Sequence, residues 1–114
     1  MSLAKNNFDL KRLKSKYAIE HLFTEGEVIR TRHLIFRVAK KEEGNTFYAG
    51  VSVAKRNFKK AVDRNKIKRQ LRVAIKTHEH LFSFPGNGMR IFKGTRALST
   101  PDIIEEAHRL FKKF

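Results

Sequence analysis

At 114 residues the chain has room for one compact domain, residues 1–114, but not for a second, catalytic domain. Lys and Arg number 26 against 11 Asp and Glu, and the formal net charge of +15 exceeds what solubility requires, so we expect an anionic partner. The absence of Cys excludes a disulfide framework, a thiol nucleophile and a thiolate metal site, and no apolar run is long enough to cross a bilayer. These features predict a cytoplasmic protein that does not associate with membranes.

The first predicted element is a short helix that begins after Ser15 and ends near Gly26. Ser15 is a favourable N-cap residue, and Gly commonly follows the last turn of a helix. The apolar residues recur with helical spacing at Ala18, Ile19, Leu22 and Phe23. Phe23 lies at the edge of this apolar face, so a place in the core and a place in the wall of a binding cleft are equally open to it.

Two strands are predicted next, at 33–39 and 46–53, with the polar stretch 40–45 as the turn between them. Their side chains alternate, and one set is apolar: Leu34, Phe36, Val38, Phe47, Ala49, Val51 and Val53. The other set includes Arg37, Tyr48 and Ser52. Because these side chains are polar or aromatic, we expect them on a partly open sheet face, where they can contact bases or phosphates.

A long helix is predicted over roughly 59–80, followed by a breaker run at 83–88 and a short strand at 89–92. The expected apolar stripe of the helix is Val62, Ile67, Leu71, Ala74 and Ile75. Arg90 interrupts the apolar pattern of the strand, but its position between two helices suits a strand that completes the sheet.

The last predicted helix has Pro101 at its first position and Thr100 as its cap. A helix, two or three antiparallel strands, a crossover helix, another strand and a final helix predict an α+β two-layer sandwich. In this arrangement the helices cover one face of the sheet, and the other face is partly free.

Residues 55–76 hold ten of the basic residues and a single acidic residue, Asp63, which gives this segment a net charge of +9. Helical spacing aligns the polar side chains in two adjoining rows: Arg64, Lys68 and Arg72, and Asn65, Arg69, Arg72 and Lys76. A rigid row of cations neutralises several phosphates at once, so the pattern predicts nucleic-acid binding. The alternative is a merely solvated helix face, but such faces usually mix charges of both signs.

Residues 50–72, GVSVAKRNFKKAVDRNKIKRQLR, resemble the signature region of the bacterial ribonuclease P protein family. The shared features are a strand ending in a small residue and Ser, a basic pair, an Arg-Asn-basic triplet and a further Arg. This chain has Arg64-Asn65-Lys66 where the family usually shows Arg-Asn-Arg, and Ile19 where an aromatic is common. The resemblance implies a central, mostly antiparallel four-stranded sheet with three helices in the order αβββαβα, and a left-handed crossover around the basic helix.

The resemblance also implies an RNA-binding subunit of ribonuclease P, an endoribonuclease, which helps a catalytic RNA to remove the 5′ leader from precursor tRNA. Catalysis and the required Mg²⁺ would then belong to the RNA, with no catalytic residue, dedicated metal site or obligate protein partner expected for this chain. The residues implied to contact the catalytic RNA are Arg64, Asn65, Lys66, Lys68, Arg69 and Arg72. The residues assigned to a leader-binding cleft are Ile19, Phe23, Arg37, Tyr48, Ser52, Lys55 and Arg56.

Two other classes of function are the alternatives, and the sequence speaks against the second of them. A structural RNA-binding protein, such as a ribosomal component, would bind its RNA without altering the cleavage of precursor tRNA. A protein-only nuclease would need a cluster of carboxylates or histidines. His78 and His80 do not form such a cluster, since side chains at i and i+2 on a helix point apart.

Overall fold

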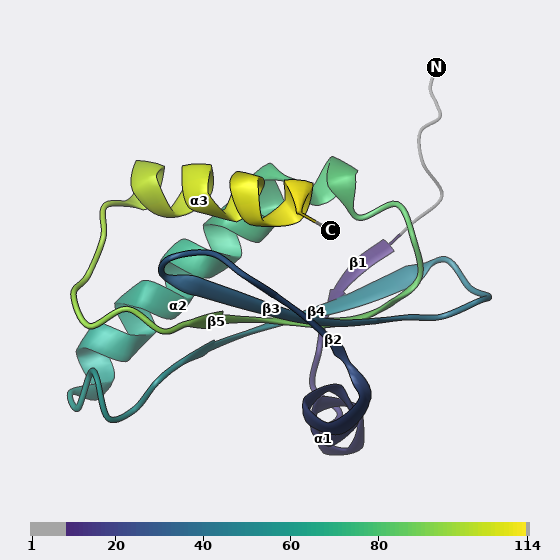
Figure 1. Ribbon diagram of the computed structural model, residues 1–114, viewed down its shortest axis with the longest axis horizontal. Helices are drawn as coiled ribbons and strands as arrows, with labels where there is room; N and C mark the ends of the chain where they lie inside the picture. The colour runs from purple at the N-terminus through teal and green to yellow at the C-terminus, as the bar shows by residue number, and fades with distance from the viewer. Residues whose placement is uncertain (1–8, 114) are drawn as a thin grey trace.

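The computed structural model describes residues 9–113, which form one sheet with helices on both of its faces (Figure 1). In chain order the elements are β1 (Asp9–Arg12), α1 (Lys16–Glu25), β2 (Glu27–Arg30), β3 (Leu34–Lys40), β4 (Thr46–Val53), α2 (Ala61–Thr77), the 3₁₀ helix η1 (Glu79–Leu81), β5 (Gly86–Phe92) and α3 (Thr100–Lys112). The predicted α+β class with three α-helices is confirmed. The predicted four-stranded sheet is not, because these residues form a five-stranded one in the order β1-β4-β5-β3-β2.

The sheet is mixed rather than mostly antiparallel, because β5 lies between β3 and β4. The β1–β4 and β4–β5 pairs are parallel, and the β5–β3 and β3–β2 pairs are antiparallel. The turn at 40–45 therefore does not close a hairpin of directly paired strands. The left-handed crossover from β4 through α2 to β5 stays a prediction of the resemblance.

The central strand β5 is longer than the predicted 89–92 because two glycines of the expected breaker run belong to it. A Cβ on Gly88 would lie 2.7 Å from ring atoms of both Phe36 and Phe47, which come from the two neighbouring strands. Gly in a strand often marks such a close approach. Gly88, which belongs to the predicted breaker run, is thus required by the packing of the sheet.

The edge strand β1 was missed by the sequence analysis. It is four residues long and mostly exposed, with Leu10 as its one partly buried side chain, so it carries no apolar alternation. Backbone hydrogen bonds attach this part of the chain to β4 and the turn before it, from Asp9 N to Asn45 O (2.8 Å) and from Leu13 N to Ala49 O (2.9 Å). Short, charged edge strands resist pairing with other chains.

Helices lie on both faces of the sheet (Figure 1). α2 and α3 cover the face on which the predicted apolar set of β3 and β4 forms the main core. α1 packs on the opposite face against β3 and β5, where Leu22 is fully buried beside Leu13 and Met89. The prediction that helices cover a single face is wrong for α1, because Leu13 and Met89 give the second face an apolar patch of its own.

The helix ends follow their capping residues. Ser15 Oγ accepts a hydrogen bond from Ala18 N (3.2 Å), which confirms the predicted cap of α1. The cap of α3 is Ser99 rather than Thr100, because Ser99 Oγ accepts from Asp102 N (3.3 Å) and Thr100 is already helical. α2 is shorter than the predicted 59–80, since the chain turns into η1 after His78.

Arg90 places a charge inside the main core. Its side chain is 1% exposed, and the guanidinium carbon lies 5.5 Å and 5.6 Å from the ring centroids of Phe36 and Phe82. None of its three guanidinium nitrogens hydrogen-bonds to a described residue. Burial lowers the pKa of Arg90 to about 10, so the group remains charged at neutral pH and the aromatic rings supply its compensating contacts.

Glu106 fastens α3 to the turn between β2 and β3. Its Oε2 accepts hydrogen bonds from Thr31 Oγ1 and from the backbone N–H of His33, both at 2.6 Å, and His33 Nδ1 lies 2.8 Å from Oε1. Burial acts to raise the pKa of Glu106, but the hydrogen bonds from Thr31 and His33 outweigh it and hold this pKa below its ordinary value.

The substitution Glu106→Gln is expected to lower the free energy of unfolding by about 1–3 kcal/mol near neutral pH, because buried donors lose a charged acceptor. Since the pKa of Glu106 is depressed in the fold, the contribution of the ionised carboxylate is present above about pH 4.3, the unfolded value, and is lost as the pH falls through the folded pKa. The difference between variant and parent should therefore shrink on acidification, as urea unfolding at several pH values would measure.

Glu105→Gln is the matched control on the same helix. Glu105 is exposed and its ion pair with Arg109 (3.5 Å) is in solvent, so the expected change is below about 0.5 kcal/mol. Equal losses in the two variants, or a difference for Glu106→Gln that widens in acid, would contradict this account of α3.

Candidate nucleic-acid interface

α2 buries one side and presents a basic surface on the other. The buried residues of the helix are Ile67, Gln70, Leu71, Ala74 and Ile75. The exposed polar residues that we call the basic surface are Asn65, Lys66, Arg69, Arg72 and Lys76. Within residues 9–113, the one ion pair on this surface joins Lys76 Nζ to Glu79 Oε2 at 3.4 Å. Most of its positive charge is thus left for an external anion.

Two cations of the predicted rows, Arg64 and Lys68, are only half exposed. Arg64 Nη1 donates hydrogen bonds to the carbonyl oxygens of Phe58 and Lys59, both at 2.8 Å. The guanidinium of Arg64 therefore holds the loop that leads into α2. The structure brings the predicted RNA-contacting residues together on one helix, but the more exposed charge is centred on Arg69 and Arg72.

Two exposed valines lie on the outer side of α2, beside the cations of the basic surface. The side chain of Val62 is 70% exposed and that of Val73 is 43% exposed. The prediction that Val62 belongs to the apolar stripe is wrong, because it stands nine residues before Leu71, about two and a half turns, and so on the opposite side of the helix. These valines add apolar contact area beside the cations.

The opposite face of the sheet carries the second group of predicted residues. Alternation places Arg37, Tyr48 and Ser52 on the face away from the main core, as predicted. The guanidinium carbon of Arg37 lies 4.7 Å from the ring centroid of Phe23 in α1, and Arg37 Nη1 donates to the Phe23 carbonyl oxygen at 3.5 Å. The Phe23 side chain remains 47% exposed, so this ring is part of the surface rather than of the core.

The other cleft residues are distributed around α1 and β4. Ile19 and Tyr48 pack, partly buried, against the small cluster that contains Leu22 and Met89. Lys55 and Arg56 are exposed in the loop that follows β4. The structure thus gathers Ile19, Phe23, Arg37 and Tyr48 at or beside α1. Lys55 and Arg56 lie beyond the end of β4, the strand that carries Ser52.

A hollow of about 430 Å³ beside Tyr48 includes residues that the sequence analysis did not single out. Lys14, Lys41 and Asn87 line it together with Tyr48, and Lys41 Nζ lies 5.9 Å from the centroid of the Tyr48 ring. These residues stand in a connection, a turn and the central strand, where no local pattern marks them. Only the strand order brings them together.

No group of three potential metal ligands is found among residues 9–113. His78 is buried and stacks on His108 at 5.0 Å between ring centroids, while His80 is exposed. Burial, and then the charge of Arg90, lower the pKa of His78. No helix in the described part of the chain combines the length and apolar character needed to span a bilayer.

Comparison with known proteins identifies one family along nearly the whole chain and relatives along about three fifths of it. A family model described as Ribonuclease P matches residues 9–114. The ribonuclease P protein component of Exiguobacterium sibiricum is 35% identical over 68 residues, 60% of this chain and 58% of that protein. The corresponding protein of Halalkalibacterium halodurans is 33% identical over 72 residues, 63% of this chain and 60% of that protein. The match thus spans about three fifths of the length of each relative.

Solved structures share the fold at lower sequence identity. The RNase P protein of Staphylococcus aureus superimposes with a TM-score of 0.78 at 24% identity, covering 90% of this chain and 93% of that one. The RNase P protein from Thermotoga maritima gives a TM-score of 0.78 at 18% identity, covering 91% and 97%. At these identities the likeness establishes the fold.

Arg64 and Arg69 should differ sharply in their effect on stability. Arg64→Gln is expected to lower the free energy of unfolding by about 1–2 kcal/mol, because two loop carbonyls lose a charged donor. Arg69→Gln removes the same charge from the exposed side of the same helix and should change the free energy of unfolding by less than about 0.5 kcal/mol. Urea unfolding of both variants measures the difference, and similar losses would show that Arg64 does not hold the loop.

Proposed function

The chain belongs to the ribonuclease P protein family, and from this premise we propose that it is the RNA-binding subunit of a ribonucleoprotein that removes the 5′ leader from precursor tRNA. In this proposal the catalytic RNA holds the Mg²⁺ ions and cleaves, while the protein supplies affinity and position. The observation that carries the proposal is the separation of two unlike surfaces on opposite faces of one sheet. One is the basic surface of α2, and the other is the aromatic and cationic region beside α1.

The basic surface of α2 suits a folded RNA. Arg69, Arg72 and Lys76 are fixed to a rigid helix along about 10 Å of its axis, so their charges are displayed together without further ordering of the backbone. Binding releases the counterions of the phosphates that these side chains neutralise. Asn65 and Lys66 extend the contact toward the start of the helix, and Arg64 and Lys68 flank it.

The region beside α1 suits a single-stranded leader. An unpaired base stacks on an exposed aromatic ring, and in this chain Arg37 holds the half-exposed ring of Phe23 in place. Tyr48 offers a second ring toward the other end of β4, and Ser52, Lys55 and Arg56 offer donors for the backbone of the strand. Ile19 gives no aromatic ring, so the stacking in this proposal rests on Phe23.

Leader length tests the proposal. The holoenzyme, reconstituted from this chain and its catalytic RNA, should bind precursor tRNA with a leader of several nucleotides more tightly than precursor with a one-nucleotide leader. Phe23→Ala should weaken binding of the long-leader precursor by about tenfold, the loss of one stacked base, and leave the short-leader precursor unchanged. Tyr17→Ala is the control, since Tyr17 is an exposed aromatic residue on a different side of α1.

The outcomes separate the alternatives. If Phe23→Ala binds both precursors like the parent while the RNA and protein still assemble, the cleft assignment is wrong. If the parent chain itself binds the RNA but alters neither precursor affinity nor cleavage, a structural RNA-binding role replaces the proposal.

A further inference from the structure

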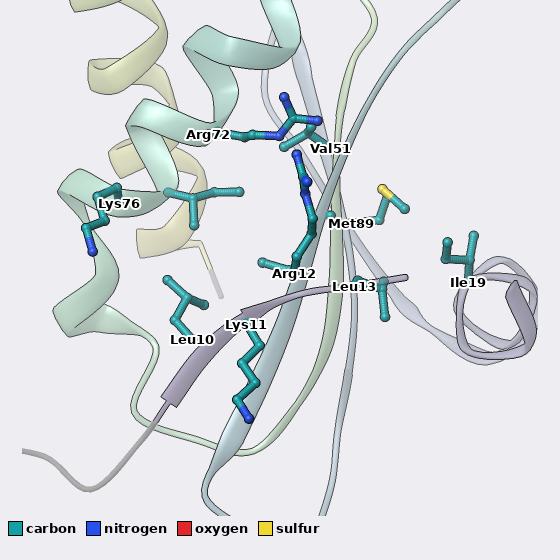
Figure 2. Close-up of a pocket in the computed structure, with 12 residues that line it drawn as sticks. Leu10, Lys11, Arg12, Leu13, Ile19, Val51, Arg72, Lys76 and Met89 are labelled. Carbon is teal, nitrogen blue, oxygen red and sulfur yellow. The ribbon is translucent and has the colours of Figure 1, made fainter. Parts of the chain in front are cut away.

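A pocket of about 290 Å³ opens where β1 meets the C-terminal half of α2 (Figure 2). Its walls are largely apolar and come from five elements and the connection after β1: Leu10, Leu13, Ile19, Ala49, Gly50, Val51, Ile75 and Met89. Four cations complete the lining: Lys11, Arg12, Arg72 and Lys76. An apolar pocket with a cationic rim suits a small anionic ligand that has a flat or apolar part.

Two of the four cations share the mouth of the pocket. The guanidinium groups of Arg12, from β1, and Arg72, from α2, point into the same space, whereas Lys11 and Lys76 point away from it (Figure 2). Burial, and then the positive charge of Arg12, lower the pKa of Arg72. Neither guanidinium makes an ion pair with a carboxylate in the range 9–113. Two like charges held together in this way repel, and an anion placed between them would offset the repulsion.

We infer that this pocket takes one unstacked nucleotide of the RNA that lies on α2, with its phosphate between Arg12 and Arg72 and its base against the apolar wall. The inference rests on the proposed function and adds to it a specific nucleotide site that includes β1. A guanidinium holds a phosphate through two parallel hydrogen bonds and also stacks on the plane of a base.

The size and position of the pocket favour a single nucleotide. Its volume lies at the lower end of the roughly 300–1,000 Å³ that small-molecule sites occupy, so it holds one ring system and no extended peptide. Arg72 is also part of the basic surface, and Ile19 belongs to the α1 side, so the pocket lies between the two proposed RNA-binding regions. As an edge strand, β1 also presents unpaired backbone groups that can hydrogen-bond the edge of a base.

A five-nucleotide single-stranded RNA and an abasic oligomer with the same phosphates test the inference. Methyl resonances of Leu10, Val51 and Ile75 report binding at the pocket in the full chain. The RNA should shift these resonances with an affinity at least about fivefold higher than that of the abasic oligomer, because only the RNA buries a base. Arg12→Gln should weaken both by about tenfold, the loss of one charge-assisted contact.

Two further variants distinguish the pocket from general attraction. Ala49→Leu fills the apolar wall without changing the charge, so it should lower RNA affinity to the abasic level and leave the abasic oligomer unaffected. Lys112→Gln removes one exposed charge at the end of α3, outside the pocket, and should change either affinity by less than about twofold. If Ala49→Leu does not fold, the affinities of the parent and of Arg12→Gln for the RNA and for the abasic oligomer decide whether the pocket binds a nucleotide.

Equal affinities for RNA and abasic oligomer at these methyl groups would overturn the inference, and so would resonances that respond to an acidic peptide but not to RNA. The affinity of the catalytic RNA for the chain, measured in parallel, separates the two proposals. Normal assembly with no base preference refutes the nucleotide site alone. Failure to assemble with the catalytic RNA refutes the proposed function, whatever the short oligomers do.

Discussion

The parallel pairing of β4 with β5 is the constraint on which the rest of the structure depends. Parallel neighbours cannot be joined by a tight turn, so the chain must cross one face of the sheet between them, and α2 forms this crossover. The crossover buries Ile67, Leu71 and Ala74 against the sheet, and its polar side is left outward. The same pairing inserts β5 between β3 and β4 and leaves the opposite face for α1.

The separation of the two faces explains how a small chain carries a high positive charge on distinct surfaces. Most cations of α2 are exposed, so water and salt weaken their mutual repulsion, and the helix tolerates them with a single carboxylate partner, Glu79, among the described residues. Arg37 differs from these exposed cations because it is half-buried and orients the ring of Phe23. β1 joins the two regions at the sheet edge, and the pocket between Arg12 and Arg72 follows from its pairing with β4.

Features that depend on local chemistry were predictable from the sequence. The Ser15 cap and the alternation of the β4 side chains between the two faces of the sheet follow from residue types at fixed spacing, and the structure confirms both. The predicted cations of α2 do share one helix, but two members of their rows, Arg64 and Lys68, are only partly exposed. Features that depend on strand order were not predictable. Gly88 looked like a breaker because the rings that pack against it come from strands that are distant in the sequence, although they are its neighbours in the sheet. β1 is recognisable only through its pairing. The α2 cations were identified, but Arg64's role in the loop was not, since its acceptors are backbone carbonyls.

The salt dependence of binding to the catalytic RNA tests the central claim most directly, that the outward side of α2 grips RNA through its phosphates. In a plot of the logarithm of affinity against that of salt concentration, each lost phosphate contact reduces the slope by about 0.7–0.9. The triple substitution Arg69→Gln, Arg72→Gln and Lys76→Gln should therefore make the slope shallower by about 2–3 and weaken binding at every salt concentration, with the fold intact. An unchanged slope and affinity in this variant would contradict the account.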